Sequence, residues 1–284
     1  MSTKILICTH REFNYIPDNS FLPIHVGKEI STINLPYQSD NSGINISSKN
    51  KNYCELTALY WAWKNLYDIN TLGLCHYRRF FDFSGNKTAN EITEITEITE
   101  NYFSNNFQNY CYKESLLEGY DIILPNQLVK TRSLYSHYSL SHLPQDFDIL
   151  AQTVVELYPE YEASFQKIMF ENNSFSPFNM LIAKKDLVDN YSNWLFSILE
   201  KVEERIEISN NPYQERVLGF MSERLLNVYV YHNQLKIKYL PVHFVADKYK
   251  SKSRLMKNVV EYNNNIIFWF RSKLTKKNHL KSIK

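Results

Sequence analysis

With 284 residues, of which 44% are hydrophobic and 22% charged, the chain has the composition of a globular protein rather than a disordered one. Only six glycines are present, and neither a G-x-G-x-x-G nor a Walker-type loop occurs, which disfavours a Rossmann dehydrogenase or a P-loop kinase. The formal net charge is +2, but eleven Lys or Arg against one acid lie over 248–284, so the rest of the chain is net acidic.

Strand-like and helix-like segments alternate along the chain. The first apolar run predicts a buried strand over 4–9, and a polar loop over 40–50 precedes a helix predicted over 53–65. Four later strands are predicted over 71–75, 120–125, 180–183 and 236–242. Three later helices are predicted over 146–167, 185–206 and 215–232. Pro159 is expected to kink or split the first of them. This alternation favours a largely parallel α/β sheet covered by helices on both faces.

Two segments stand apart from this pattern. Residues 91–100 repeat the triplet EIT, and we expect them to be a low-complexity insertion on the surface with no role in catalysis. The basic segment over 246–284 contains the apolar-aromatic run Ile266–Phe270 and is predicted to be a helical, amphipathic tail. Such a tail suits contact with a membrane surface, and equally a packed C-terminal helix with a solvated face. The main domain is therefore expected over 1–245.

The cysteine pattern indicates a reducing compartment. Four cysteines are scattered without a C-x-x-C pair, which disfavours a zinc ribbon or a disulfide framework. The N-terminus lacks the apolar stretch of a signal peptide, and no apolar run approaches the length of a transmembrane helix. We therefore expect a cytoplasmic protein, peripheral to the inner face of the membrane if its tail binds lipid.

The most telling cationic motif of the chain follows the strand predicted over 71–75. It consists of His76, Tyr77, Arg78 and Arg79. Arginine pairs bidentately with phosphate oxygens, so two adjacent arginines at a strand end favour a diphosphate contact. Because successive side chains of a strand point to opposite sides, one of the two could instead make a structural ion pair.

Several segments of the chain resemble a known family. They are NISSKNKNYCELTALYWAWKN, LGLCHYRRFF, YDIILP, NMLIAKKDLVDNYSNWLFSIL and ERVLGFMSERLL, which occur in the expected order within about residues 4–245. The family contains bacterial exopolysaccharide and lipopolysaccharide proteins; it long carried a domain-of-unknown-function label and has since been linked to glycosyltransferases, including galactofuranosyltransferase domains. The resemblance implies a GT-A-like fold, in which a Rossmann-type mixed α/β sheet flanked by helices binds a nucleotide sugar.

Enzymes of that fold commonly hold a divalent metal on the diphosphate through an Asp-x-Asp motif after a middle strand. Here the comparable place reads His76–Arg79, so we expect these cations to neutralise the leaving diphosphate directly and favour neither a metal nor another cofactor. The one Asp-x-Asp motif, Asp146–Asp148, opens a predicted helix, where acids serve as caps. We assign capping to Asp148 and leave Asp146 open as an acceptor contact or metal ligand.

Further donor contacts are implied by the resemblance, which covers the polar loop and its residues Asp40, Asn45, Lys49 and Asn50. For Asp40 and Asn45, plain turn chemistry is a strong alternative explanation. Glu55 lies near the start of the helix predicted over 53–65 and either binds sugar hydroxyls or favours the helix N-terminus. His10 ends the first strand, at the edge where such sheets bind ligands, and could approach the nucleotide base; a lone histidine there is more often structural.

Transfer with inversion, which we expect here, requires a carboxylate that takes the proton of the acceptor hydroxyl. The first candidate is Glu223, in the family segment FMSERLL, and Asp146 is the second. A helix ion pair of Glu223 with Arg216 or Arg224 explains that glutamate about as well. The residues assigned to the acceptor, also in family segments, are Asn179, Arg216 and Arg224.

These observations lead us to expect a glycosyltransferase. It would move a sugar, such as galactose in furanose or pyranose form, from a UDP-sugar to a growing lipid-linked surface polysaccharide or lipopolysaccharide. The alternative from another class is a non-catalytic glycan- or nucleotide-sugar-binding subunit of a polysaccharide assembly complex. Nucleic-acid binding is disfavoured because the positive charge is confined to the tail rather than spread over the domain.

Overall fold

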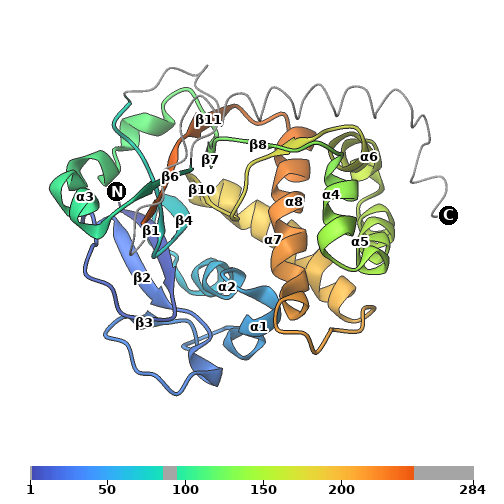
Figure 1. Ribbon diagram of the computed structural model, residues 1–284, viewed down its shortest axis with the longest axis horizontal. Helices are drawn as coiled ribbons and strands as arrows, with labels where there is room; N and C mark the ends of the chain where they lie inside the picture. The colour runs from blue at the N-terminus through green and yellow to red at the C-terminus, as the bar shows by residue number, and fades with distance from the viewer. Residues whose placement is uncertain (1, 86–94, 246–284) are drawn as a thin grey trace. The chain divides into compact units, whose positions relative to one another are not determined.

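The computed structural model describes residues 2–85 and 95–245, which form two compact units (Figure 1). The described residues of the first unit lie within Met1–Asn126, Phe178–Ser192 and Leu235–Ser251. Those of the second unit lie within Gln127–Pro177 and Asn193–Gln234. The basic tail predicted over 246–284 lies outside the described residues, as does the first part of the EIT repeat.

The first unit is built on one mixed β-sheet. In the described part of the chain this sheet has ten strands, β1 (Thr3–Thr9), β2 (Phe21–His25), β3 (Gln38–Ser39), β4 (Thr71–His76), β5 (Arg79–Phe81), β6 (Ile95–Ile98), β7 (Ile122–Pro125), β10 (Leu181–Lys184), β11 (Ile237–Leu240) and β12 (Val242–Val245). The main path runs β11-β7-β10-β4-β1-β2-β3, while β5, β6 and β12 extend it from β4.

The centre of the sheet explains why the first apolar run is a strand. Ile5, Leu6 and Ile7 of β1 are fully buried, as expected of a central strand covered on both faces. β1 pairs in parallel with β2 and β4, whereas β10 runs antiparallel to both β4 and β7. The predicted mixed sheet flanked by helices is confirmed, and the expectation that it is largely parallel is wrong at β10, because register and burial rather than chain order set its direction.

The EIT repeat is partly built into this sheet. β6 pairs in parallel with β12, and Ile98 at its end is 4% exposed within the hydrophobic core. Thr99 then caps helix α3 (Glu100–Asn105) through its side-chain oxygen. The expectation that the repeat over 91–100 lies on the surface is therefore wrong at Ile98, because this side chain packs into the hydrophobic core.

The aromatic residues of the first unit mostly fill its core. Phe80 lies 4.8 Å from Phe103, which stacks on Tyr110 with ring centroids 4.1 Å apart. All three are at most 1% exposed. These three rings are thus explained by packing in the core.

Short helices cover the rest of this unit. They are η1 (Lys28–Ile30), η2 (Ser47–Lys49), α1 (Asn50–Tyr53), α2 (Leu56–Asn65), η3 (Phe107–Tyr110) and η4 (Glu114–Leu117). Helix α2 packs against β1 (Figure 1). The helix predicted over 53–65 begins instead at Leu56, because Cys54 has a positive φ of 53° and interrupts the α-helical path.

The second unit is mainly helical. Its elements are β8 (Leu128–Val129), α4 (Leu134–Ser141), α5 (Pro144–Leu157), η5 (Pro159–Tyr161), α6 (Glu162–Phe170), β9 (Ser174–Phe175), η6 (Gln214–Arg216) and α8 (Val217–His232). α6 packs on α4 and α8, and β8 pairs with β9. The expected break at Pro159 is confirmed, since α5 ends before it and α6 follows it. The remaining helix, α7 (Lys185–Glu203), contains the boundary between the units.

Within residues 2–85 and 95–245, no helix is both long enough and apolar enough to span a membrane.

Candidate functional site

The carboxyl ends of β1 and β4 bring two predicted site segments together. Cys8 of β1 is in register with His76, the last residue of β4, and Cys8 O accepts a hydrogen bond from Tyr77 N at 3.1 Å. The residues that follow these strand ends, His10 and Arg11 on one side and Tyr77 and Arg78 on the other, therefore lie at the same edge of the sheet. This is the edge at which open α/β sheets bind ligands.

Tyr77 is the centre of the cationic part of this edge. The Cζ atoms of Arg11 and Arg78 lie 4.9 Å and 5.0 Å from the centroid of its ring. The ring of His10 approaches edge-on, with centroids 5.3 Å apart. Partial desolvation and the charges of Arg11 and Arg78 lower the pKa of His10, so this histidine favours its neutral form. The structure thus places two guanidinium groups on one ring at this edge.

Arg79 lies on a different pair of rings. Its Cζ atom is 4.5 Å from the ring centroid of Phe178 and 5.7 Å from that of Phe244, both within cation–π range. Phe244 is paired with Arg79 across β12 and β5. The sequence left open that one of the two arginines makes a structural ion pair. Arg78 does not make one with the described residues.

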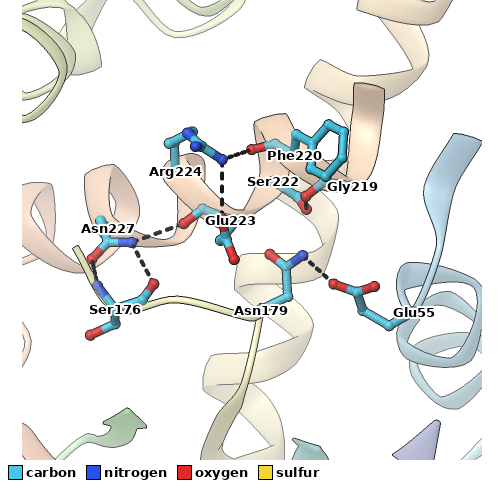
Figure 2. Close-up of polar contacts among 9 residues, drawn as sticks. All are labelled: Glu55, Ser176, Asn179, Gly219, Phe220, Ser222, Glu223, Arg224 and Asn227. Carbon is cyan, nitrogen blue, oxygen red and sulfur yellow. Dashed lines mark hydrogen bonds and ion pairs between the residues drawn. The ribbon is translucent and has the colours of Figure 1, made fainter. Parts of the chain in front are cut away.

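A chain of contacts joins Glu55 to the same edge. Asn179 Nδ2 donates a hydrogen bond to Glu55 Oε1 at 2.6 Å (Figure 2). His76 Nε2 lies 2.8 Å from the carbonyl oxygen of Phe178, the residue before Asn179. Cys8 Sγ lies 3.7 Å from the carbonyl oxygen of Glu55. Asn179, predicted to contact the acceptor, therefore lies beside the predicted donor residues Glu55 and His76.

The backbone around Glu55 and Asn179 is held in unusual conformations. In residues 2–85 and 95–245, four non-glycine residues have a positive φ, and three of them are Cys54 at 53°, Phe178 at 74° and Asn179 at 54°. Such conformations cost energy and concentrate at ligand-binding sites, where the surrounding structure enforces them. We call His10, Arg11, Glu55, 76–79, Phe178 and Asn179 the strand-edge cluster.

The polar loop over 40–50 is organised mainly around its own contacts. Asp40 is fully buried and accepts hydrogen bonds from Gly27 N at 2.8 Å, Lys28 N at 3.1 Å and the Ser47 hydroxyl. Gly27 has a φ of 67°, and a Cβ there would lie only 2.7 Å from Asn50 Oδ1, so glycine is required for this turn. Asp40 therefore braces the loop, and its contact with the donor stays a prediction.

The other three candidates of this loop behave similarly. Asn45 Oδ1 accepts a hydrogen bond from Ser47 N at 3.1 Å, which is the expected turn chemistry. Asn50 Nδ2 donates to Cys54 O at 2.7 Å and so supports the residue before Glu55. The Lys49 ammonium is exposed and lies 5.8 Å from the ring centroid of Tyr53. Asn50 is thereby connected, through Cys54, to the strand-edge cluster.

A second polar cluster lies on α8 in the other unit. Glu223 Oε2 pairs with Arg224 Nη1 at 3.0 Å, and Arg224 Nη1 also donates to Phe220 O at 2.8 Å (Figure 2). Asn227 Nδ2 donates to Glu223 O at 2.9 Å, and Asn227 exchanges two hydrogen bonds with the backbone of Ser176. The Glu223 side chain is 19% exposed and that of Arg224 only 4%. The predicted ion pair of Glu223 thus forms with Arg224.

The remaining predicted residues lie elsewhere in the second unit. Arg216 precedes α8, and its Cζ atom is 5.3 Å from the ring centroid of Phe220. Asp146 is in the first turn of α5 and 6% exposed, and burial raises the pKa of its carboxyl group. The capping role assigned to Asp148 is wrong, because α5 begins at Pro144 and Asp148 accepts a hydrogen bond from Tyr135 Oη instead.

Within the described residues, no group of three or more His, Cys, Asp or Glu side chains is arranged to hold a metal ion.

Sequence reasoning missed two members of the strand-edge cluster, Arg11 and Phe178, and one neighbour of the cluster, Phe244. Arg11 directly follows His10 at a predicted strand end, so its position alone was a usable signal. Phe178 and Phe244 carry no such signal, since each is far from Arg79 in sequence and reaches it only through the fold.

Comparisons with known proteins extend these observations. The model of a family described as "Domain of unknown function (DUF4422)" matches residues 4–234. Among solved structures, the apo structure of the WbbM bifunctional glycosyltransferase matches with a TM-score of 0.77 at 33% sequence identity, covering 87% of this chain and 46% of that one. The chain thus spans about half the length of that protein. The search of curated proteins gives no match.

Proposed function

Because the chain belongs to the DUF4422 family and is similar to part of a bifunctional glycosyltransferase, we propose that it is a nucleotide-sugar-dependent glycosyltransferase. The observation that carries the proposal is the pair of guanidinium groups, Arg11 and Arg78, on the ring of Tyr77 at the carboxyl edge of the sheet. An anionic diphosphate is the part of a nucleotide sugar that such an edge would bind.

In this proposal the strand-edge cluster holds the donor, a UDP-sugar. Arg78 and Arg79 neutralise the charge that grows on the diphosphate as the sugar leaves, which is the role that a metal ion takes in other transferases. Neutral His10 contacts the nucleotide base. Glu55, oriented by Asn179, accepts hydrogen bonds from hydroxyl groups of the donor sugar.

The proposed chemistry is a single displacement with inversion. The acceptor oxygen forms a bond to the anomeric carbon, the bond from that carbon to the diphosphate breaks, and UDP leaves with the bonding electrons. Glu223 takes the proton of the acceptor hydroxyl. Its carboxylate is positioned by Arg224, while its carbonyl oxygen is held by Asn227. Asp146, whose raised pKa favours proton uptake, is the second candidate base.

The wider role is also a proposal. We assign the acceptor to a growing, lipid-linked surface polysaccharide or lipopolysaccharide, with galactose as the first donor sugar to test. The basic segment over 248–284 is assigned to contact with the inner face of the membrane. The competing function is a non-catalytic subunit that binds nucleotide sugars or glycans, which the same cationic edge would also serve.

The decisive experiment measures UDP release from a panel of UDP-sugars, with and without EDTA. It compares wild type with Arg78→Ala and, as a matched control, Arg132→Ala, which removes an exposed arginine of the second unit. We expect donor-specific release that survives EDTA, falls about tenfold or more in Arg78→Ala and is unchanged in Arg132→Ala. Loss of UDP release in EDTA would still support a transferase, but it would reject the proposal that the arginines take the place of a metal ion.

A second variant distinguishes the proposed enzyme from the alternative, a non-catalytic binding subunit. Glu223→Gln keeps the shape of the side chain but cannot accept the proton as a carboxylate does. We expect it to bind UDP like wild type and to lose nearly all turnover. UDP or glycan binding without release from any donor, in wild type itself, would favour the subunit.

A further inference from the structure

Three basic side chains of the second unit surround one ring beside Glu223. Measured to the centroid of the Phe175 ring, Lys130 Nζ lies at 5.7 Å, Arg224 Cζ at 5.3 Å and the ring of His137 at 6.4 Å. Pairing of β8 with β9 fixes this arrangement, because Val129 is in register with Ser174 and Lys130 N donates to Asn173 O at 2.7 Å. We call Lys130, His137, Arg224 and Phe175 the Phe175 cluster.

Positive charge exceeds negative charge in this cluster. Glu223 is paired with Arg224, whereas Lys130 Nζ makes no ion pair with any residue of the described ranges. Burial lowers the pKa of Lys130 and Arg224 adds to this, against the opposing effect of Glu223. Burial, Lys130 and Arg224 together lower the pKa of His137 to about 4, so its ring is neutral near pH 7. Two cations, Lys130 and Arg224, therefore share the one carboxylate of Glu223 in a half-buried setting, and this excess of positive charge is costly unless an anion binds.

Hydrogen-bonding capacity is also left over. Arg224 uses only Nη1 for its two hydrogen bonds, to Phe220 O and Glu223. Its Nε, together with His137 Nδ1 and the Tyr138 hydroxyl, is buried without a hydrogen-bond partner among the described residues. Buried polar groups are rarely left unpaired, and a cluster of them at a cationic site indicates a ligand. The edge of a guanidinium group formed by Nε and Nη2 suits a planar or tetrahedral oxyanion.

We propose that the Phe175 cluster binds an anionic group, a carboxylate or a phosphate, carried by the acceptor glycan. This inference rests on the proposed function, because it takes Glu223 to be the base. The molecule that touches the base is the acceptor, so an anion site beside Glu223 belongs to the acceptor rather than to the donor. Lys130 supplies the attracting charge, and Arg224 links the anion site to the carboxylate of Glu223.

The first test is kinetic. Acceptor oligosaccharides that end in a glucuronate, carry a lipid-linked phosphate, or are neutral are compared with wild type, Lys130→Gln, Lys130→Arg and the surface control Lys167→Gln. We expect Lys130→Gln to raise the KM for one anionic acceptor class about tenfold or more, with little change for the neutral acceptor or in the donor KM. Lys130→Arg should retain most of the affinity, and Lys167→Gln should match wild type. The glucuronate and phosphate acceptors show which source of the anion the site takes.

A second readout does not depend on turnover. Glucuronate or inorganic phosphate should raise the melting temperature of wild type and Lys167→Gln more than that of Lys130→Gln, because a ligand that binds only the folded state stabilises it. Equal shifts in all three proteins would overturn the anion site. Weaker UDP binding by Lys130→Gln with an unchanged acceptor KM would overturn its assignment to the acceptor. If no donor is turned over, the proposed function fails, and the melting shifts still decide whether the anion site exists.

Discussion

Asn179 donates a hydrogen bond to the carboxylate of Glu55, although the two residues are 124 positions apart in sequence, and it does so from a left-handed backbone conformation with φ of 54°. Asparagine is one of the few non-glycine residues that tolerate this conformation. The pair therefore combines a charged hydrogen bond with a strained backbone at the strand edge proposed to bind the donor.

This geometry predicts an order of stability among Asn179 variants. Asn179→Gly loses the hydrogen bond but tolerates the backbone, so the free energy of unfolding should fall by about 1–2 kcal/mol. Asn179→Ala adds the strain of a left-handed alanine and should lose roughly 1 kcal/mol more. Urea denaturation at pH 7 measures both values. Equal stability of the two variants would show that the conformation of residue 179 is not enforced.

We predict that Asp40 stabilises the folded protein. Its buried carboxylate accepts hydrogen bonds from two backbone N–H groups and from Ser47. Asp40→Ala leaves these donors unpaired and should lower the free energy of unfolding by about 3 kcal/mol, as denaturation in urea would measure. Asn45→Ala, in the same loop but half-buried, should cost less than about 1 kcal/mol. A stable Asp40→Ala protein with lost UDP binding would instead restore the donor-contact assignment.

His137 is predicted to make the protein sensitive to acid. Because its pKa is lowered from 6.5 to about 4 by burial and by Lys130 and Arg224, the unfolded chain binds the proton more readily than the folded one. Stability contributed by neutral His137 is thus present above pH 6.5 and is lost as the pH falls towards 4. The loss should be about 1–2 kcal/mol, since solvent screens a partly buried ring.

His137→Gln tests this prediction when its melting temperature is followed from pH 7.5 to pH 4. The other histidines with lowered pKa values, His10, His25 and His142, remain in both proteins, so the difference isolates His137. The variant should lose less stability than wild type on acidification. Parallel curves for the two proteins would contradict the lowered pKa.

We predict that the buried carboxylate of Asp146 lowers the free energy of unfolding at pH 7. Burial raises the pKa of its carboxyl group, so keeping it ionised at pH 7 costs free energy. Asp146→Asn removes the charge and should raise the free energy of unfolding by up to about 1 kcal/mol at pH 7. The advantage should shrink at acid pH, because the wild-type carboxyl group becomes protonated there. A loss of UDP release in this more stable variant would assign Asp146 to the acceptor or to proton transfer; unchanged release would remove it from the site.

We predict that Ile98, in the EIT repeat, stabilises the folded protein. Because this side chain is 4% exposed in the core, Ile98→Ala should lower the free energy of unfolding by about 2–4 kcal/mol in a urea titration. Ile33→Ala is the matched control, since Ile33 is 52% exposed and should change stability by less than about 0.5 kcal/mol. Similar effects of the two substitutions would mean that β6 does not belong to the core in solution.

The sequence predicted the candidate site where the signal was local. The apolar runs of β1 and β4 end at His10 and His76, and strand ends at one edge of a sheet bind ligands, so His10 and the arginines after His76 could be recognised. The role of Asp40 could not be predicted from the sequence, because the sequence of a turn is the same whether its carboxylate binds a ligand or the backbone of the loop. The pairing of Glu55 with Asn179 was also out of reach, since no periodicity relates residues that far apart.

By itself, the sequence determined the alternation of strands and helices, the break at Pro159 and the membership of a family, because these depend on short-range pattern and on ordered motifs. Only the tertiary structure decided that β10 is antiparallel to its neighbours, that part of a low-complexity repeat becomes β6, and that Lys130 and Arg224 share the ring of Phe175. Strand register and the placement of charges depend on which distant surfaces are buried together, and that balance of free energy is set by the whole chain rather than by any local segment.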